Sequence, residues 1–147
     1  MTEVEFHTGV QDAVGFTCRL LRKAHRQSVR VVVTAPSEVL ADLDRQLWTF
    51  DEQDFVPHVR VLDVPGAAGT LAARTPIWLA PYASLPGAPR VVVNLGADAP
   101  TNLSAVERLI EVVVVDVDQA ERGRSRWRAY KQAGLHIRHH GGGEARE

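Results

Sequence analysis

The chain has 147 residues, of which 45% are hydrophobic, 24% charged and 6% aromatic, and its formal net charge is −1. This length and composition are typical of one globular domain, and the balanced charge excludes a wholly basic nucleic-acid coat. The one cysteine, Cys18, excludes a disulfide framework and a four-cysteine zinc site. No apolar run exceeds four residues (Val112–Val115) and the first residues do not resemble a secretory signal, so we expect a cytoplasmic protein that does not span a membrane.

The first third of the chain alternates predicted strands and helices. Glu3–His7 alternates apolar and polar residues like a short strand, and Asp12–Gln27 has the apolar spacing of a helix with a basic outer face. Val29–Thr34 is a β-branched run typical of a strand buried on both faces. Ser37 is then the predicted N-cap of a helix over Glu38–Leu47, which completes a strand–turn–helix unit.

The second part of the chain begins with a predicted loop, Val64–Ala73, rich in Gly, Ala and Pro. Further strands are predicted at Ile77–Ala80, Arg90–Leu95 and Leu109–Val115. Leu103–Arg108 is expected to form a short helix, and Asp116–Ala133 a long one that Gly134 ends. This alternation predicts a single α/β domain over residues 1–140, with a mainly parallel sheet flanked by helices. Residues 141–147 are expected to form a disordered tail.

Motifs that would hold a ligand are weak in this sequence. Gly66–Thr70 lacks the Gly-Lys-Ser/Thr ending of a phosphate-binding loop, and Gly96–Asp98 is interpreted as a turn although strand ends of this kind often bind ligands. His136, His139 and His140 have no cysteine or carboxylate beside them at ligand spacing. We therefore expect no metal and no cofactor.

Candidate catalytic groups have ordinary structural explanations. Cys18 lies in the apolar stripe of a helix, and Asp116 and Asp118 suit the dipole at a helix start. His7 and His25 are expected to be partly buried structural histidines. Neighbouring motifs supply no set of nucleophile, base and orienting group, so we expect a protein that is not an enzyme. The alternative is a small nucleotide- or phosphate-binding α/β enzyme.

The net charge conceals two segments of opposite sign. Residues 38–63 carry seven acids and two bases, whereas residues 122–138 carry no acid and six bases, which are Arg122, Arg124, Arg126, Arg128, Lys131 and Arg138. Four side chains of the last helix share one face at helical spacing: Arg124, Trp127, Arg128 and Lys131.

Trp127 also belongs to an apolar stripe with Ala120, Gly123, Tyr130 and Gly134, which is predicted to face the core. This position between core and cations suits a peptide end that carries both a carboxylate and a large apolar side chain. A solvated basic face, with Trp127 simply packed inside, explains the same pattern. Direct binding of nucleic acid by the basic helix is a further, weaker reading.

The acidic segment holds three large aromatic residues, Trp48, Phe50 and Phe55, in a stretch with loop-like composition that continues to Pro57 and His58. Aromatic rings in such a stretch cover either the core or a partner. We expect at least one of the three rings to lie in an interface.

These two motifs together resemble the family of bacterial DNA polymerase III chi subunits. The resemblance rests on Leu47-Trp48, on Phe55-Val-Pro57-His58, and on the pattern Arg124-x-Arg-Trp127-Arg-x-Tyr-Lys131-x-x-Gly134. It covers residues 3 to 140 and is weakest between Asp63 and Arg90. It implies a non-catalytic α/β protein with nucleotide-binding-like topology that bridges the clamp loader to single-stranded-DNA-binding protein and meets DNA mainly indirectly.

The resemblance also implies roles for residues at both motifs. Arg124, Trp127 and Arg128, with Lys131 on the same face, would bind the acidic C-terminal tail of single-stranded-DNA-binding protein. A further basic position of the family corresponds to Ala120 here, so that contact is lost. Bridging to the clamp loader would run through the psi subunit, where present, on a surface made of Trp48, Phe55, Pro57 and His58.

Overall fold

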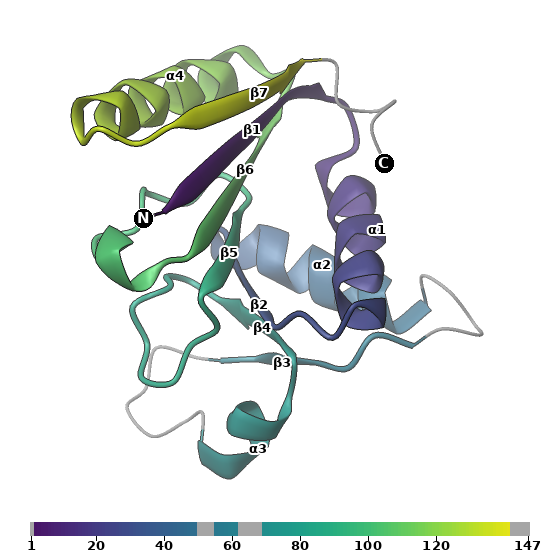
Figure 1. Cartoon of the computed structure of the whole chain (residues 1–147). Helices are drawn as coiled ribbons and strands as arrows, with labels where there is room; N and C mark the ends of the chain where they lie inside the picture. The colour runs from purple at the N-terminus through teal and green to yellow at the C-terminus, as the bar shows by residue number, and fades with distance from the viewer. Residues whose placement is uncertain (1, 50–54, 62–68, 142–147) are drawn as a thin grey trace.

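The computed structural model describes residues 2–49, 55–61 and 69–141, and these form one sheet of seven strands in the order β3-β4-β2-β5-β6-β1-β7 (Figure 1). Every neighbouring pair of strands is parallel. The strands are β1 (Glu3–Val10), β2 (Val31–Thr34), β3 (His58–Arg60), β4 (Ile77–Ala80), β5 (Val91–Asn94), β6 (Arg108–Val114) and β7 (Ile137–Gly141). The predicted α/β class with a mainly parallel sheet flanked by helices is confirmed.

The helices begin and end where local chemistry favours it. They are α1 (Ala13–Arg26), α2 (Ser37–Thr49), α3 (Gly69–Arg74) and α4 (Val117–Gln132), with a 3-10 turn at Leu103–Ala105. The carboxylates of Asp12 and Asp116 accept hydrogen bonds at 3.0 Å from the backbone N–H groups that open α1 and α4. After α4 the chain turns at Gly134, whose φ of 83° favours glycine.

The two faces of the sheet are covered differently. α1 and α2 lie on one face and α4 on the other (Figure 1). Because side chains alternate along each strand, β2 sends Val31 and Val33 toward α1 and α2, and Val32 toward the opposite core. That opposite core also contains residues of the connections before and after β5, where the described chain has no α-helix. No helix of the described residues is long and apolar enough to cross a membrane.

Several details differ from the sequence prediction. Two strands with little apolar pattern, β3 and β7, are additional, and Gly141, the first residue of the expected tail, is the last residue of β7. The expected loop over residues 64–73 contains the start of α3, and Leu103–Arg108 gives only a 3-10 turn before β6. Ser37 is the first residue of α2, not its N-cap, and Trp48 belongs to that helix instead of a loop. Residues 50–54, 62–68 and 142–147, which include Phe50 and Gly66, lie outside the described part.

Candidate protein-binding surfaces

Trp127 lies where α4 meets the edge of the sheet. Its ring is half-buried and packs against the buried Phe6 of β1, with ring centroids 4.9 Å apart. The exposed His139 of β7 meets the same indole edge-on at 5.5 Å. Two neighbouring strands therefore hold Trp127 in place, while part of its ring stays available to a ligand.

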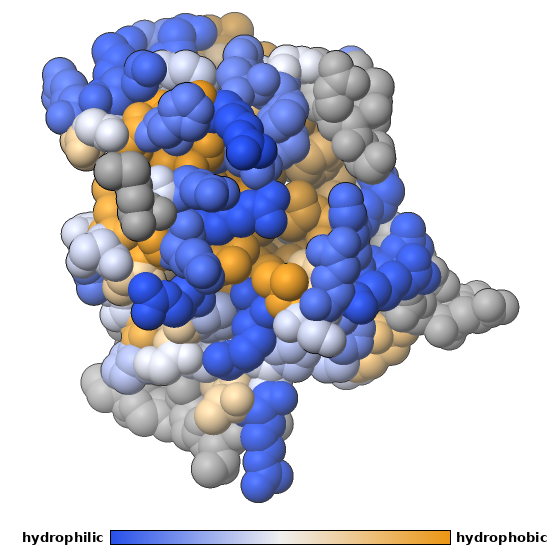
Figure 2. Space-filling view, in the orientation of Figure 1, coloured by the Kyte–Doolittle hydropathy of each residue, from blue (hydrophilic) through white to orange (hydrophobic). Residues whose placement is uncertain are grey.

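Three exposed cations share the face of α4 on which Trp127 lies. Arg124, Arg128 and Lys131 are all exposed, and together with Trp127 they form what we call the basic seam. The Arg124 guanidinium pairs with Glu121 at 2.6 Å, and Arg128 donates to the Ser125 hydroxyl at 3.4 Å. Figure 2 shows hydrophilic side chains in the region of α4 and β7, with hydrophobic surface visible between them. Because such exposed contacts are weak, an anionic ligand can replace them at low cost.

The sequence did not indicate that one arginine of α4 faces the sheet. Arg126, counted from sequence with the basic surface, is 8% exposed, and its Nε donates to Oε1 of Glu111 at 3.0 Å. The other carboxylate oxygen of Glu111 accepts from the Tyr130 hydroxyl at 2.6 Å and from the Asn94 amide at 3.1 Å. Charges of opposite sign and full hydrogen bonding make this burial tolerable.

This buried network fixes the height and rotation of α4. Asn94 reaches β2 as well, since its Oδ1 accepts from the Thr34 hydroxyl at 3.2 Å. Burial raises the pKa of Glu111, while Arg126 and the hydrogen-bond donors oppose that rise. Burial and then Glu111 raise the pKa of Tyr130, so its hydroxyl remains a donor. The network therefore connects β2, β5, β6 and α4 directly beneath the basic seam.

A second candidate surface lies where α2 meets β3. Trp48, in the last turn of α2, is 62% exposed, and Phe55, before β3, is 45% exposed. Their ring centroids are 5.1 Å apart, so the two form one exposed aromatic pair. Large rings left in water next to each other are typical of a protein-binding surface.

His58 packs against both rings of this pair on their buried side, and its own side chain is not exposed. Its side chain is 1% exposed, and its ring centroid lies 5.3 Å from that of Trp48 and 5.8 Å from that of Phe55. One ring nitrogen contacts the backbone oxygen of Val56 at 2.7 Å, and the other contacts Asp44 at 2.9 Å. Pro57, which directly precedes His58 in the chain, is half-buried. Asp44, which sequence reasoning missed, thus joins α2 to β3 through this imidazole.

Other candidate groups have the positions that the sequence indicated or serve the fold. Cys18 is fully buried, which confirms its predicted place in the core, and burial raises the pKa of its thiol to about 11, which disfavours the reactive thiolate. At the end of β5, the Asn94 side chain bonds both the N–H and the carbonyl of Ala97. Gly96, which lies between these two residues, has a φ of 91°, so this segment is a turn held by the Asn94 side chain.

The architecture places the chain in the class of parallel α/β proteins that carry exposed aromatic and basic surfaces at the margins of the sheet. The family model of the DNA polymerase III chi subunit, HolC, matches residues 1–138, and the chain belongs to this family. It is similar to the DNA polymerase III subunit chi of Pseudomonas aeruginosa strain PAO1, with 27% identity over 146 residues, covering 95% of this chain and 96% of the relative. The resemblance seen in the sequence is confirmed, and the family connects the protein to DNA replication.

Proposed function

We propose that this protein is a non-catalytic accessory subunit of the replicative polymerase, which links the clamp loader to single-stranded-DNA-binding protein in the cytoplasm. Family membership supports the association with the polymerase. The observation that supports the bridge is the presence of two exposed surfaces of different chemistry, one basic and one aromatic. DNA is met mainly through the coating protein, since the chain as a whole carries a net charge of −1.

The basic seam suits the acidic C-terminal tail of single-stranded-DNA-binding protein. Arg124 and Arg128 would pair with carboxylates of the tail, and the half-buried Trp127 would form the wall for its last apolar side chain. A contact this small corresponds to micromolar affinity, about −8 kcal/mol, with a clear dependence on salt. Several weak contacts at one replication fork raise the effective affinity without further surface.

Calorimetric titration with a peptide of that tail tests this assignment. At about 0.1 M salt, Arg128→Glu should weaken binding roughly tenfold or more, because it replaces an attractive charge by a repulsive one. Arg122→Glu is the matched control, since it makes the same charge change on another face of α4. Equal losses in both variants, or no binding of the unmodified chain at low salt, would reject the assignment.

The aromatic pair would dock the psi subunit and through it the clamp loader. Phe55→Ala removes an exposed ring and takes away neither hydrogen-bond partner of the His58 imidazole. We expect this variant to lose co-purification with the psi subunit of the same organism, because central aromatic rings dominate binding energy at interfaces. Val117→Ala, an exposed apolar residue at the start of α4, should retain it. Equal retention by both variants would contradict this role.

A further inference from the structure

Three possible metal ligands meet where β1 pairs with β7. Glu5 and His7 are two residues apart on β1, so their side chains project from the same face of the sheet. β7 lies parallel to β1 with His140 directly opposite His7. Residues from opposite ends of the chain are thus neighbours, and the carboxylate that the sequence spacing did not place beside the C-terminal histidines is supplied by Glu5.

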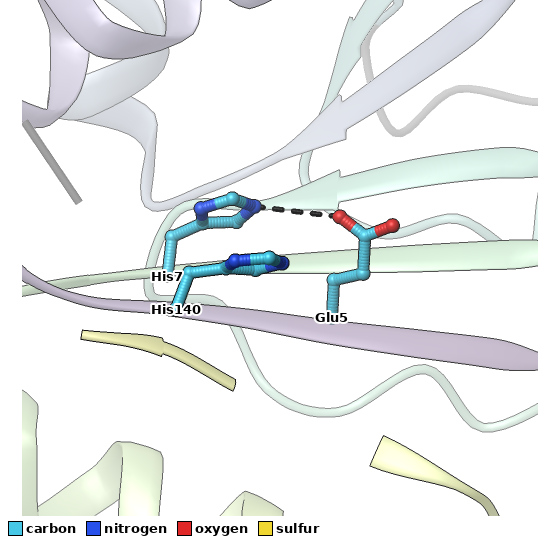
Figure 3. A group of neighbouring side chains, drawn as sticks. All are labelled: Glu5, His7 and His140. Carbon is cyan, nitrogen blue, oxygen red and sulfur yellow. Dashed lines mark hydrogen bonds and ion pairs between the residues drawn. The ribbon is translucent and has the colours of Figure 1, made fainter. Parts of the chain in front are cut away.

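The ligand atoms of these three side chains already lie close together. They are all within 4.8 Å of one another, and His7 Nε2 is 3.4 Å from Glu5 Oε1. The two imidazole rings stack with centroids 4.7 Å apart and planes 14° apart. Figure 3 shows that each ring turns one nitrogen toward the Glu5 carboxylate. Bonds of about 2.0–2.1 Å in a tetrahedral zinc site separate neighbouring ligand atoms by roughly 3.3 Å, so the spacing needs little change. Because each nitrogen lone pair lies in its ring plane, the nearly parallel rings must also rotate until both point at the same ion.

The surroundings leave the necessary atoms available. Arg108 donates to Oε2 of Glu5 at 2.9 Å, which orients the carboxylate and leaves Oε1 directed at the histidines. His7 is 8% exposed, and its Nδ1 has no hydrogen-bond partner among the described residues, so no backbone group fixes which nitrogen carries the proton. His140 is half-buried on an edge strand, which gives an ion access from solvent.

We propose that Glu5, His7 and His140 bind Zn²⁺, with water at a fourth position. Two imidazole nitrogens with one carboxylate oxygen form a ligand set that zinc accepts in tetrahedral geometry. The site is separate from the basic seam and the aromatic pair, and goes beyond the function proposed above. Its structural effect is to fasten the edge strand β7 to β1, its one neighbour in the described part of the sheet.

Zinc binding would also steady one wall of the basic seam. The residue before His140 is His139, whose ring meets Trp127 at 5.5 Å and whose Nε2 lies 2.7 Å from the Thr8 hydroxyl. Because successive side chains of a strand point to opposite faces, a metal held on one face of β7 limits the movement of His139 on the other.

Titration of the full untagged chain with Zn²⁺, after treatment with a chelator, tests the proposal. We expect one ion per chain, with a dissociation constant in the micromolar range or below. At zinc concentrations about one hundred times that constant, the Tm should rise by roughly 5–10 °C. Co²⁺ in place of zinc should give the visible absorption of a tetrahedral site.

Two ligand variants and one matched control decide the result. His140→Ala, on the edge strand, should weaken zinc binding at least thirtyfold and abolish the Co²⁺ absorption, and Glu5→Gln should do the same with little change of shape. His136→Ala removes an exposed histidine of the same segment and should have no effect. Absence of binding up to 0.1 mM zinc, unchanged binding in His140→Ala, or an equal loss in His136→Ala would each overturn the proposal. None of these readouts involves the tail peptide or psi, so the proposed function is tested separately.

Discussion

Arg126 and Arg128 lie two positions apart on α4 and have opposite surroundings. Arg126 is buried against the carboxylate of Glu111, whereas Arg128 is exposed beside Ser125. Sequence patterning predicted that Arg128 is exposed but did not predict that Arg126 is buried. In the sequence Arg126 is one of several arginines spaced two residues apart, and nothing in its local pattern distinguishes it from the exposed ones. The one available signal was Glu111, an acid inside an apolar strand run, which requires a partner of opposite charge.

Removing one partner of the buried pair should destabilise the protein strongly. Arg126→Met leaves Glu111 buried without its counter-charge, so we expect a loss of about 3–5 kcal/mol in the free energy of unfolding. Urea denaturation followed by circular dichroism measures this loss. Arg128→Met is the control and should change the same quantity by less than about 0.5 kcal/mol. Similar values for both variants would show that the Glu111–Arg126 contact contributes little.

The buried thiol of Cys18 should make stability fall in alkaline solution. Its pKa is about 11 in the folded chain against 9.0 for the free group, because burial disfavours the thiolate. The unfolded chain therefore releases this proton first, and the stability contribution that is complete below pH 9 is lost as pH rises toward 11. We expect a loss of about 1 kcal/mol between pH 8 and pH 10 that is missing in Cys18→Ala, as measured by urea denaturation at each pH. Parallel pH profiles of the two proteins would contradict it.

At the scale of elements, the sequence predicted the strands that are buried on both faces of the sheet and did not predict the two at its edges. β2, β4 and β5 are central strands with continuous apolar runs, which sequence patterning identifies directly. β3 and β7 are the two edge strands, and their sequences, His-Val-Arg and Ile-Arg-His-His-Gly, have no such run. An edge strand forms backbone hydrogen bonds with one neighbouring strand. Its own residues do not reveal which strand that neighbour is, so the sequence gives little sign of it.

Close packing of α4 on the sheet should make its position sensitive to residue size. A Cβ atom at Gly123 would lie 3.1 Å from both terminal carbons of Val113, so a large side chain there must lift the helix. Gly123→Leu should lower the free energy of unfolding by about 1–3 kcal/mol and weaken binding of the tail peptide. Ala129→Leu, at an exposed position of the same helix, should alter neither quantity. A Gly123→Leu protein as stable as the unmodified chain would refute the close approach.

For the whole molecule, the order of the strands decides how the two candidate surfaces relate. The aromatic pair lies by β3 at one edge of the sheet, and the basic seam lies by β7 at the other. Six strand spacings of about 4.8 Å separate those edges by roughly 29 Å. Strand order was outside the reach of sequence reasoning, because it follows from pairings between residues far apart in the chain. Both motifs were recognised in the sequence, but their placement at opposite edges was not.

Surfaces so far apart should bind independently. Phe55→Ala should change the dissociation constant of the tail peptide by less than twofold, and Arg128→Glu should leave co-purification with psi unchanged. Calorimetry with and without bound psi gives the same comparison for the unmodified chain. A change of fivefold or more in either direction would show coupling through the sheet.

The place of β1 between β6 and β7 has a consequence for the order of folding. Glu3 pairs with Arg108 and Val4 with Ile137, so both partners of this strand lie more than one hundred residues away. Closing such long loops costs more entropy than joining nearer neighbours, and the edge that holds Trp127 should therefore assemble late. Since the indole of Trp127 rests on Phe6 of β1, this contact holds the indole in place only after that strand has docked. With the tail-binding role proposed above, the number of peptide sites per chain in a titration therefore also measures what fraction of molecules has completed this folding step.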